Sequence, residues 1–240
     1  MIKFINILFK ISLIIFLSYL IFYTSSKFKK QPVNNISFVF DNDESNSFIT
    51  KGDLLNIINE IIDYRNMKLS DLSLNIIETE LKKNKFIKSA EVYLLPNGNL
   101  EVYVAQKEPI MRIVNEKSSY YIDEKGVRFP LSTNFTENVP IVTGLNDSSN
   151  IFYLVKLISL ISNDSFLSSQ IVQVNFNQNN EIELIPRVGH NKILFGDFSE
   201  MNDKLNKLKI FYSKGVHQIG WDKHGLINLK YKQQIVCVKR

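Results

Sequence analysis

Residues 87–113 constrain the fold of this 240-residue chain most strongly, because they form two arms in which apolar and polar residues alternate around a turn. A period of two over both arms predicts a β-hairpin with one buried face. The apolar positions of the two arms are Ala90, Val92, Leu94, Leu100, Val102 and Val104. We therefore expect a sheet whose apolar face is covered by another layer.

The turn of this hairpin lies in the stretch PNGN at residues 96–99, since Gly and Asn tolerate positive φ. A two-residue loop at 97–98 would pair Val92 with Tyr103 and place the aliphatic sets on opposite faces. A three-residue loop at 97–99 would pair Val92 with Val104 and place both sets on one face. We expect the three-residue loop, because one face must be buried.

The segment before the hairpin predicts one strand and two helices. Residues 36–40 alternate as a strand, and Thr50 is an expected N-cap with Asp53 three residues later, as in a capping box. Apolar residues recur at helical spacing after Thr50 and again over residues 72–83. The order is strand, helix, helix, strand, strand, so we expect an α+β unit with both helices on one sheet face.

After Pro109, which cannot donate to a ladder and ends the hairpin near Glu108, the pattern changes to short strands. A helix is expected from about Asn150, and another is expected to be capped by Ser199 and to end at Gly215. Strands are expected at 111–114, 119–122, 127–130, 139–142, 171–176, 181–186, 192–195, 225–231 and 234–238. The second half is therefore a strand-rich α+β domain.

Residues 4–23 are almost all apolar, interrupted by Asn6 and Lys10. At ~1.5 Å per residue they match a hydrocarbon core of ~30 Å, so we expect a transmembrane helix that stays uncleaved. The alternative is a cleaved signal peptide with its apolar core at 11–23. Residues 1–10 carry two lysines and the amino terminus, and three lysines follow the span, so the positive-inside count does not place the amino end in the cytoplasm.

The chain carries few signs of chemistry. Its net charge of +5 comes without a dense basic run, so we expect no nucleic-acid partner. Cys237 is the only cysteine and His190, His217 and His224 lack ligand spacing, so we expect no metal. Phosphate-binding loops and nucleophile–base motifs are missing from the sequence. We expect no cofactor, no small-molecule substrate and no enzymatic activity.

The last two strands are the segment with a functional interpretation. Strands at a carboxyl end often lie at a sheet edge, where unpaired N–H and C=O groups accept a partner strand. The alternative is that residues 226–231 and 235–238 pair with each other and complete the sheet. That pairing still leaves one outer edge open.

The order of these segments resembles the FtsQ/DivIB family of bacterial cell-division proteins, and the first unit resembles the POTRA (polypeptide-transport-associated) domain. The matching stretches cover most of the chain: FIKSAEV at 86–92, QKEPIMRI at 106–113, YIDEKGV at 121–127, VPIVTG at 139–144, and INLKY at 227–231 with QIV at 234–236. The resemblance implies residues 1–30 as a short cytoplasmic tail and transmembrane helix, 31–108 as a POTRA-like domain and 109–240 as the β domain.

The resemblance also implies a function. Such a protein is a scaffold of the division machinery, held in the cell inner membrane with its bulk in the periplasm, and helps to regulate septal cell-wall synthesis. Its β domain binds FtsB/DivIC-like and FtsL-like partners by strand addition. Carried over to this chain, the expected partner-binding residues are Leu229, Lys230, Tyr231, Ile235, Val236 and Val238. The alternatives are a POTRA-bearing component of polypeptide transport or outer-membrane assembly, and a periplasmic enzyme.

Overall fold

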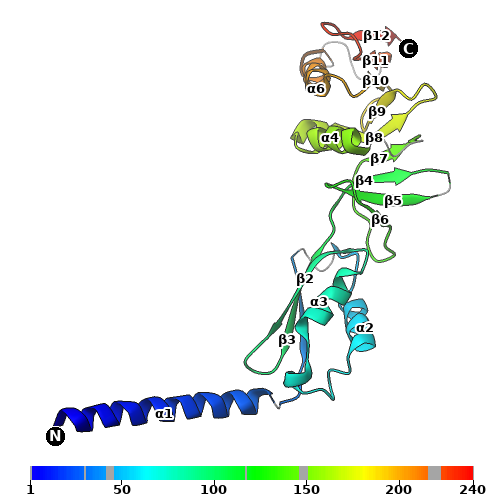
Figure 1. The fold of residues 1–240 in the computed structure, drawn as a ribbon. Coiled ribbons are helices and arrows are strands. Elements are labelled where there is room, and N and C mark those ends of the chain that lie inside the picture. Colours follow the sequence, from blue (N-terminus) through cyan, green and yellow to red (C-terminus); the bar gives the residue numbers. More distant parts are fainter. Residues whose placement is uncertain are drawn as a thin grey trace. The chain divides into compact units, whose positions relative to one another are not determined.

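A computed structural model describes residues 2–29, 31–41, 46–116, 118–145, 151–215 and 223–239 (Figure 1). The chain divides into two compact units, residues 1–106 and residues 107–240. Both units combine helices with a β-sheet, as the sequence predicts for an α+β protein.

The first unit has the predicted order of strand, helix, helix, strand, strand after its amino-terminal helix. Its elements are α1 (Ile2–Lys29), β1 (Ile36–Phe40), α2 (Lys51–Ile61), the 3₁₀ turn η2 (Leu69–Asp71), α3 (Leu74–Lys82), β2 (Ile87–Leu94) and β3 (Leu100–Gln106). The sheet order is β1-β3-β2, with β1 parallel and β2 antiparallel to β3. Helices α2 and α3 lie on the same side of this sheet and share its core (Figure 1).

Helix α2 begins at the predicted N-cap. Thr50 Oγ1 accepts from Asp53 N at 3.1 Å, and Asp53 Oδ2 accepts from Thr50 N at 3.0 Å. Both halves of the capping box are therefore present, and they satisfy main-chain N–H groups that have no partner inside the helix.

The hairpin β2–β3 has the predicted face but a different register. Val92 pairs with Val102, not with Val104, and the three-residue loop is 96–98, one position earlier than predicted. Gly98 N donates to Leu95 O at 2.9 Å, and Gly98 has φ +80°, so this glycine takes the left-handed position that ends the turn. A shift of two residues keeps every side chain on its face, and Ala90, Val92, Leu100, Val102 and Val104 are buried together.

The predicted amino-terminal helix is present as α1, and its described large apolar side chains between Phe9 and Tyr23 are exposed. Among the residues that the structure describes, however, no helix has both the length and the apolar character that a membrane crossing requires. The helix predicted for residues 4–23 is therefore present, whereas the predicted membrane span is not supported.

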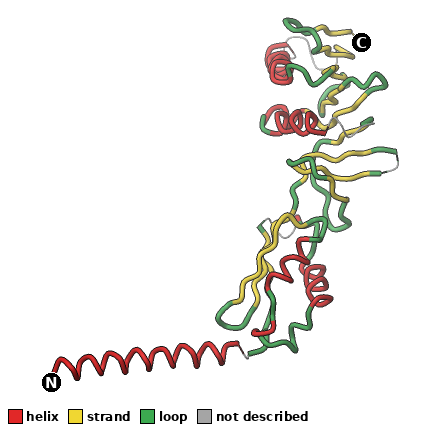
Figure 2. Tube along the Cα trace, viewed as in Figure 1, coloured by secondary structure: helices red, strands yellow, loops and turns green. Residues whose placement is uncertain are grey.

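The second unit contains one sheet of nine strands with its helices on one side (Figure 2). Its elements are β4 (Pro109–Val114), β5 (Ser119–Asp123), β6 (Arg128–Pro130), β7 (Ile141–Thr143), α4 (Ile151–Ser162), α5 (Ser165–Gln170), β8 (Ile171–Phe176), β9 (Ile182–Pro186), β10 (Lys192–Gly196), α6 (Met201–Ile210), the π-helical turn η4 (Phe211–Gly215), β11 (His224–Asn228) and β12 (Val236–Lys239). The strand order is β12-β11-β10-β9-β8-β7-β4-β5-β6.

The helices of this unit differ from the predictions in two ways: one helix was not predicted, and one predicted N-cap is wrong. Helix α5 has no counterpart in the predictions, because it is short and is stabilised by its N-cap Asp164, which accepts from Phe166 N and Leu167 N. Helix α6 has Glu200 as its N-cap, in the left-handed conformation at φ +48°, instead of Ser199. The Ser199 hydroxyl donates to Asp197 Oδ1, so it does not cap the helix.

Two predicted ends also differ. Gly215 closes the π-helical turn η4 instead of following a regular helix, and the strand expected at 225–231 ends at Asn228. Asn150, the expected start of α4, and His217 lie outside the described residues. Strand β8 has the predicted bounds, and β9 and β10 differ from theirs by one residue.

Candidate partner-binding edge

Strand β12 lies at one edge of the nine-stranded sheet. It pairs antiparallel with β11, with Leu226 opposite Val238 and Asn228 opposite Val236. No described strand pairs with its other side. The two terminal strands therefore pair with each other, as one alternative held, and an outer edge remains open. The opposite edge, β6, is only three residues long and ends at Pro130, which makes it a poor template for a partner strand.

The direction of the main-chain groups of β12 follows from the neighbouring ladder. Leu229 N donates to Leu194 O at 2.9 Å, so the main-chain groups of Leu229 point toward β10. Successive residues of a strand point their N–H and C=O groups to alternate sides, so those of Asn228 and its partner Val236 point toward each other. The N–H and C=O groups of Cys237 consequently face away from β11, toward the open edge.

The side chains of β12 alternate between the two faces of the sheet. Ile235 and Cys237 are partly buried and pack against the core that α6 covers. Val236 and Val238 lie on the opposite face and are 36% and 52% exposed. Partial burial raises the pKa of the Cys237 thiol, so it is a less reactive thiol than an exposed one.

Three lysines hold the turn between β11 and β12. Lys207 of α6 donates from Nζ to Leu229 O at 3.1 Å and to Tyr231 O. Lys230 Nζ lies 2.6 Å from Glu181 Oε1, and Lys232 Nζ lies 3.0 Å from Glu200 Oε1. The hydrogen bond from Lys230 lowers the pKa of the Glu181 carboxyl and raises that of Lys230. The turn is thus tied to α6, to the β10–α6 loop and to the start of β9.

The predicted partner-binding residues fall into three groups. Leu229 is fully buried, so its side chain belongs to the core of the second unit. Lys230 and Tyr231 lie in the turn, where Tyr231 is 49% exposed. Val236 and Val238 are exposed on β12, and Ile235 precedes the strand with its side chain on the core side. Sequence reasoning missed Cys237, whose main-chain groups face outward; the period-two alternation around it was the available signal.

The face of the sheet opposite the helices carries a row of polar contacts. Thr143 Oγ1 donates to Asn175 Oδ1 at 2.8 Å, and Asn175 Nδ2 donates to Glu183 Oε2 at 3.1 Å. Lys192 Nζ lies 3.9 Å from the same Glu183 oxygen. The row crosses β7, β8, β9 and β10, so it ends before the exposed valines of β12. Cross-strand polar pairs of this kind stabilise a solvated sheet face.

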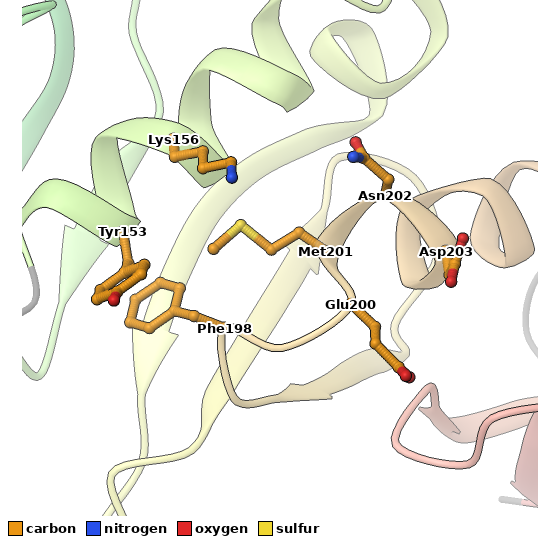
Figure 3. Close-up of a pocket in the computed structure, with 7 residues that line it drawn as sticks. All are labelled: Tyr153, Lys156, Phe198, Glu200, Met201, Asn202 and Asp203. Carbon is orange, nitrogen blue, oxygen red and sulfur yellow. The ribbon is translucent and has the colours of Figure 1, made fainter.

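A hollow of about 320 Å³ lies between α4 and the start of α6 (Figure 3). Its aromatic wall is formed by Tyr153 and Phe198, whose ring centroids are 5.7 Å apart. The remaining lining residues are Lys156, Glu200, Met201, Asn202 and Asp203. Figure 3 shows no two of the polar side chains converging on one point inside the hollow, as a catalytic pair would.

A second hollow, of about 540 Å³, lies beside the turn before β12 and includes Lys204. The Lys204 side chain is buried, and its Nζ donates to Asp197 Oδ1 at 2.7 Å and to Asp197 O at 3.0 Å. These contacts hold the pKa of the Asp197 carboxyl well below its usual range. A carboxylate with so low a pKa is a poor general base, so this pair is structural.

The described residues contain no group of three or more His, Cys, Asp and Glu side chains that could hold a metal ion. His190 is exposed. His224 lies in β11, and the centroid of its ring is 6.3 Å from that of the Phe211 ring. In the part of the second unit that the structure describes, the open edge of β12 is a feature with a binding geometry.

Comparison with known families adds two matches. The family described as FtsQ/DivIB, C-terminal related, matches residues 108–238, and a POTRA-like domain matches residues 32–105. The first match covers more than half of the chain and contains the whole nine-stranded sheet except the last residue of β12. No curated protein matches the chain.

Proposed function

Because the chain belongs to the FtsQ/DivIB family, we propose that it is a scaffold of the bacterial division machinery that binds partner proteins by adding their strand to β12. The two matched domains make it a division-related POTRA protein. Strand addition, the partners and the membrane position are the proposed part.

The observation that carries the proposal is the outward direction of the Cys237 main-chain groups at the edge of the sheet. An unpaired N–H and C=O on an edge strand supply the hydrogen bonds of β-augmentation. The lysine contacts of the turn before β12 hold the strand in place, so less conformational entropy is lost when a partner pairs with it.

The two faces of β12 define the partner strand. A strand added beside β12 continues both faces of the sheet, so its side chains meet Val236 and Val238 on one face and the partly buried Cys237 on the other. Apolar residues on both faces of the partner strand suit these neighbours. Lys239 at the end of β12 favours acidic residues beside that strand. We propose FtsB/DivIC-like and FtsL-like proteins as these partners.

The amino-terminal helix is the proposed membrane anchor. Helix α1 contains 28 residues, and the described large apolar side chains between Phe9 and Tyr23 are exposed to solvent in the isolated chain. Exposed apolar residues of this density are unfavourable in water and favourable in hydrocarbon. The proposed location is the cell inner membrane, with both folded units on the periplasmic side.

A proline at position 237 tests strand addition. Cys237→Pro removes the outward N–H without removing the bonds between β11 and β12, so it should abolish co-purification with FtsB/DivIC-like partners. Cys237→Val is the matched control, because it keeps the N–H and an apolar side chain. Circular dichroism should show that both variants stay folded. Undiminished co-purification of a folded Cys237→Pro variant would contradict the proposal.

The same variants carried as fluorescent fusions test the division role. The wild-type fusion should form a band at mid-cell, and the Cys237→Pro fusion should fail to recruit its partners there. An even distribution of the wild-type fusion around the envelope contradicts a division scaffold and favours the POTRA-bearing transport alternative.

A further inference from the structure

The open face of the three-stranded sheet carries two exposed tyrosines and two glutamates. The register places Glu91 opposite Tyr103 and Tyr93 opposite Glu101, so the four residues alternate on neighbouring strands. Tyr93 and Tyr103 are 48% and 42% exposed, on the side of the sheet away from α2 and α3. Large aromatic side chains gathered on an exposed sheet face mark an interaction surface more often than isolated ones do.

The contacts within this surface hold the rings in place. The Tyr93 and Tyr103 rings meet edge to face, with their centroids 5.5 Å apart and an interplanar angle of 89°. The Tyr93 hydroxyl donates to Glu91 Oε2 at 2.5 Å, and the Tyr103 hydroxyl donates to Glu101 Oε2 at 3.0 Å. These hydrogen bonds to carboxylates raise the pKa of both tyrosines, which stay neutral. Each glutamate has a second oxygen, Oε1, for which the structure gives no contact with described residues.

The charge of this surface is opposite to that of the chain. The outward side chains in the paired register of β1, β2 and β3 include Glu91 and Glu101 and no basic residue; the one basic residue of these strands, Lys88, is exposed at the bulge of β2 between Ile87 and Ser89. Ser37 and Val39 of β1 continue the two rows beside Glu101 and Tyr103. The surface is therefore anionic and aromatic in a protein with a net charge of +5.

We propose that this face is a second interaction surface, and that it binds a basic segment of a partner protein through arginine or lysine side chains. A guanidinium group can stack on a tyrosine ring while its N–H groups reach a carboxylate, and the four residues supply both contacts twice. Residues two apart on an extended segment lie ~6.6 Å apart, a spacing comparable to that of the two tyrosine rings. The inference goes beyond strand addition at β12, because it concerns the other unit of the chain.

A carbohydrate is the other ligand that exposed aromatic rings can bind by stacking. The two carboxylates favour the basic segment, because a neutral sugar gains nothing from their charge, whereas a cation gains Coulomb energy with each. The attraction should weaken as salt is added, since the surface is exposed.

The probe for this surface is a synthetic peptide of alternating arginine and serine, titrated against the full-length chain in lipid nanodiscs by fluorescence anisotropy. We expect the peptide to bind and the same peptide with citrulline in place of arginine to bind about tenfold more weakly. Glu91→Gln with Glu101→Gln should weaken arginine-peptide binding by about the same factor. Glu60→Gln with Glu80→Gln removes two charges from α2 and α3 instead, and should change binding by less than about twofold.

The tyrosines allow a second, independent comparison. Tyr93→Phe with Tyr103→Phe keeps both rings and frees the carboxylates, so peptide binding should persist, whereas Tyr93→Leu with Tyr103→Leu should weaken it. Cys237→Pro should leave peptide binding unchanged, which separates this surface from β12. Equal binding of the citrulline peptide, no effect of the glutamate variants, or displacement of the peptide by a chitin oligosaccharide would each overturn the proposal.

Discussion

In the first unit, the Val92 N–H of edge strand β2 donates to Glu78 Oε1 of helix α3 at 2.9 Å. In the second unit, no described strand lies beside the corresponding edge of β12, where the Cys237 N–H faces outward. In the first sheet, a glutamate side chain accepts a hydrogen bond from an outward N–H of the edge strand β2. In the second sheet, no described strand pairs with the outer side of β12, where the Cys237 N–H points.

The contacts around the two edge strands agree with this difference. Strand β2 packs closely against α3, which supplies Glu78 from the next layer. Near β12, Lys207 donates to the turn before the strand, and Lys230 and Lys232 of that turn form ion pairs with Glu181 and Glu200; none of these contacts involves the outer edge of β12. These contacts fix the position of β12 while leaving its hydrogen-bonding groups accessible to a partner.

The largest expected effect tests whether the two units are stable independently. Gly144 has φ +72°, and a Cβ at this position would lie 2.1 Å from Phe176 O. Gly144→Ala should therefore destabilise the second unit by about 3 kcal/mol or more, since both the backbone and the contact become strained. Hydrogen exchange should show faster exchange in β8 and β9 and unchanged exchange in β2 and β3. Equal acceleration in both sheets would show that the units unfold together.

A smaller effect is expected when the occupied edge is opened. Glu78→Leu removes the acceptor of the Val92 N–H and should cost about 1 kcal/mol, because an N–H on a partly exposed edge is left to water. It should also cause concentration-dependent association, measured by analytical ultracentrifugation. Glu78→Gln keeps an acceptor oxygen and is the control. A Glu78→Leu variant that stays monomeric with unchanged stability would contradict the comparison of the two edges.

The smallest expected effect is a loss of stability at low pH in the helix layer of the second unit. The hydrogen bond from Lys209 lowers the pKa of Asp164, the N-cap of α5. A carboxyl whose folded pKa is lowered contributes stability that is present above its unfolded pKa of about 3.9 and is lost as the pH falls through the folded value. The pair is partly exposed, so we expect ~0.5 kcal/mol at most. Urea titrations should show that the stability difference between the wild type and Lys209→Met shrinks below pH ~4; a constant difference would contradict this.

Local features of the fold were predictable because their causes lie within a few residues. The capping box of Thr50 and Asp53 spans three positions, and both atoms that it requires are specified by those two residues. The alternation of residues 87–104 placed the aliphatic side chains on one face correctly. The register was wrong by two residues, because it depends on which residue of the turn takes positive φ, and Gly98 takes it.

The candidate site was only partly predictable. Sequence reasoning placed the edge in the last strands, and β12 is an edge strand. It also selected Leu229, which is buried, and omitted Cys237, because the face and direction of each residue depend on the pairing with β10 and β11. The acceptors that Lys207 finds at Leu229 and Tyr231 lie more than twenty positions away in the chain, and no local pattern signals them.

The sequence by itself determined the order of the elements apart from α5, the apolar face of the β2–β3 hairpin, and the resemblance to a family, since periodicity and turn residues act between near neighbours. The tertiary structure decided the order of the nine strands, in which β4 pairs with β7 and β12 lies outermost. Strand order depends on hydrogen bonds between segments distant in sequence, each of which could pair with several others at similar local cost. The open edge of β12 is therefore a property of the assembled sheet, and Cys237 acquires its outward N–H only there.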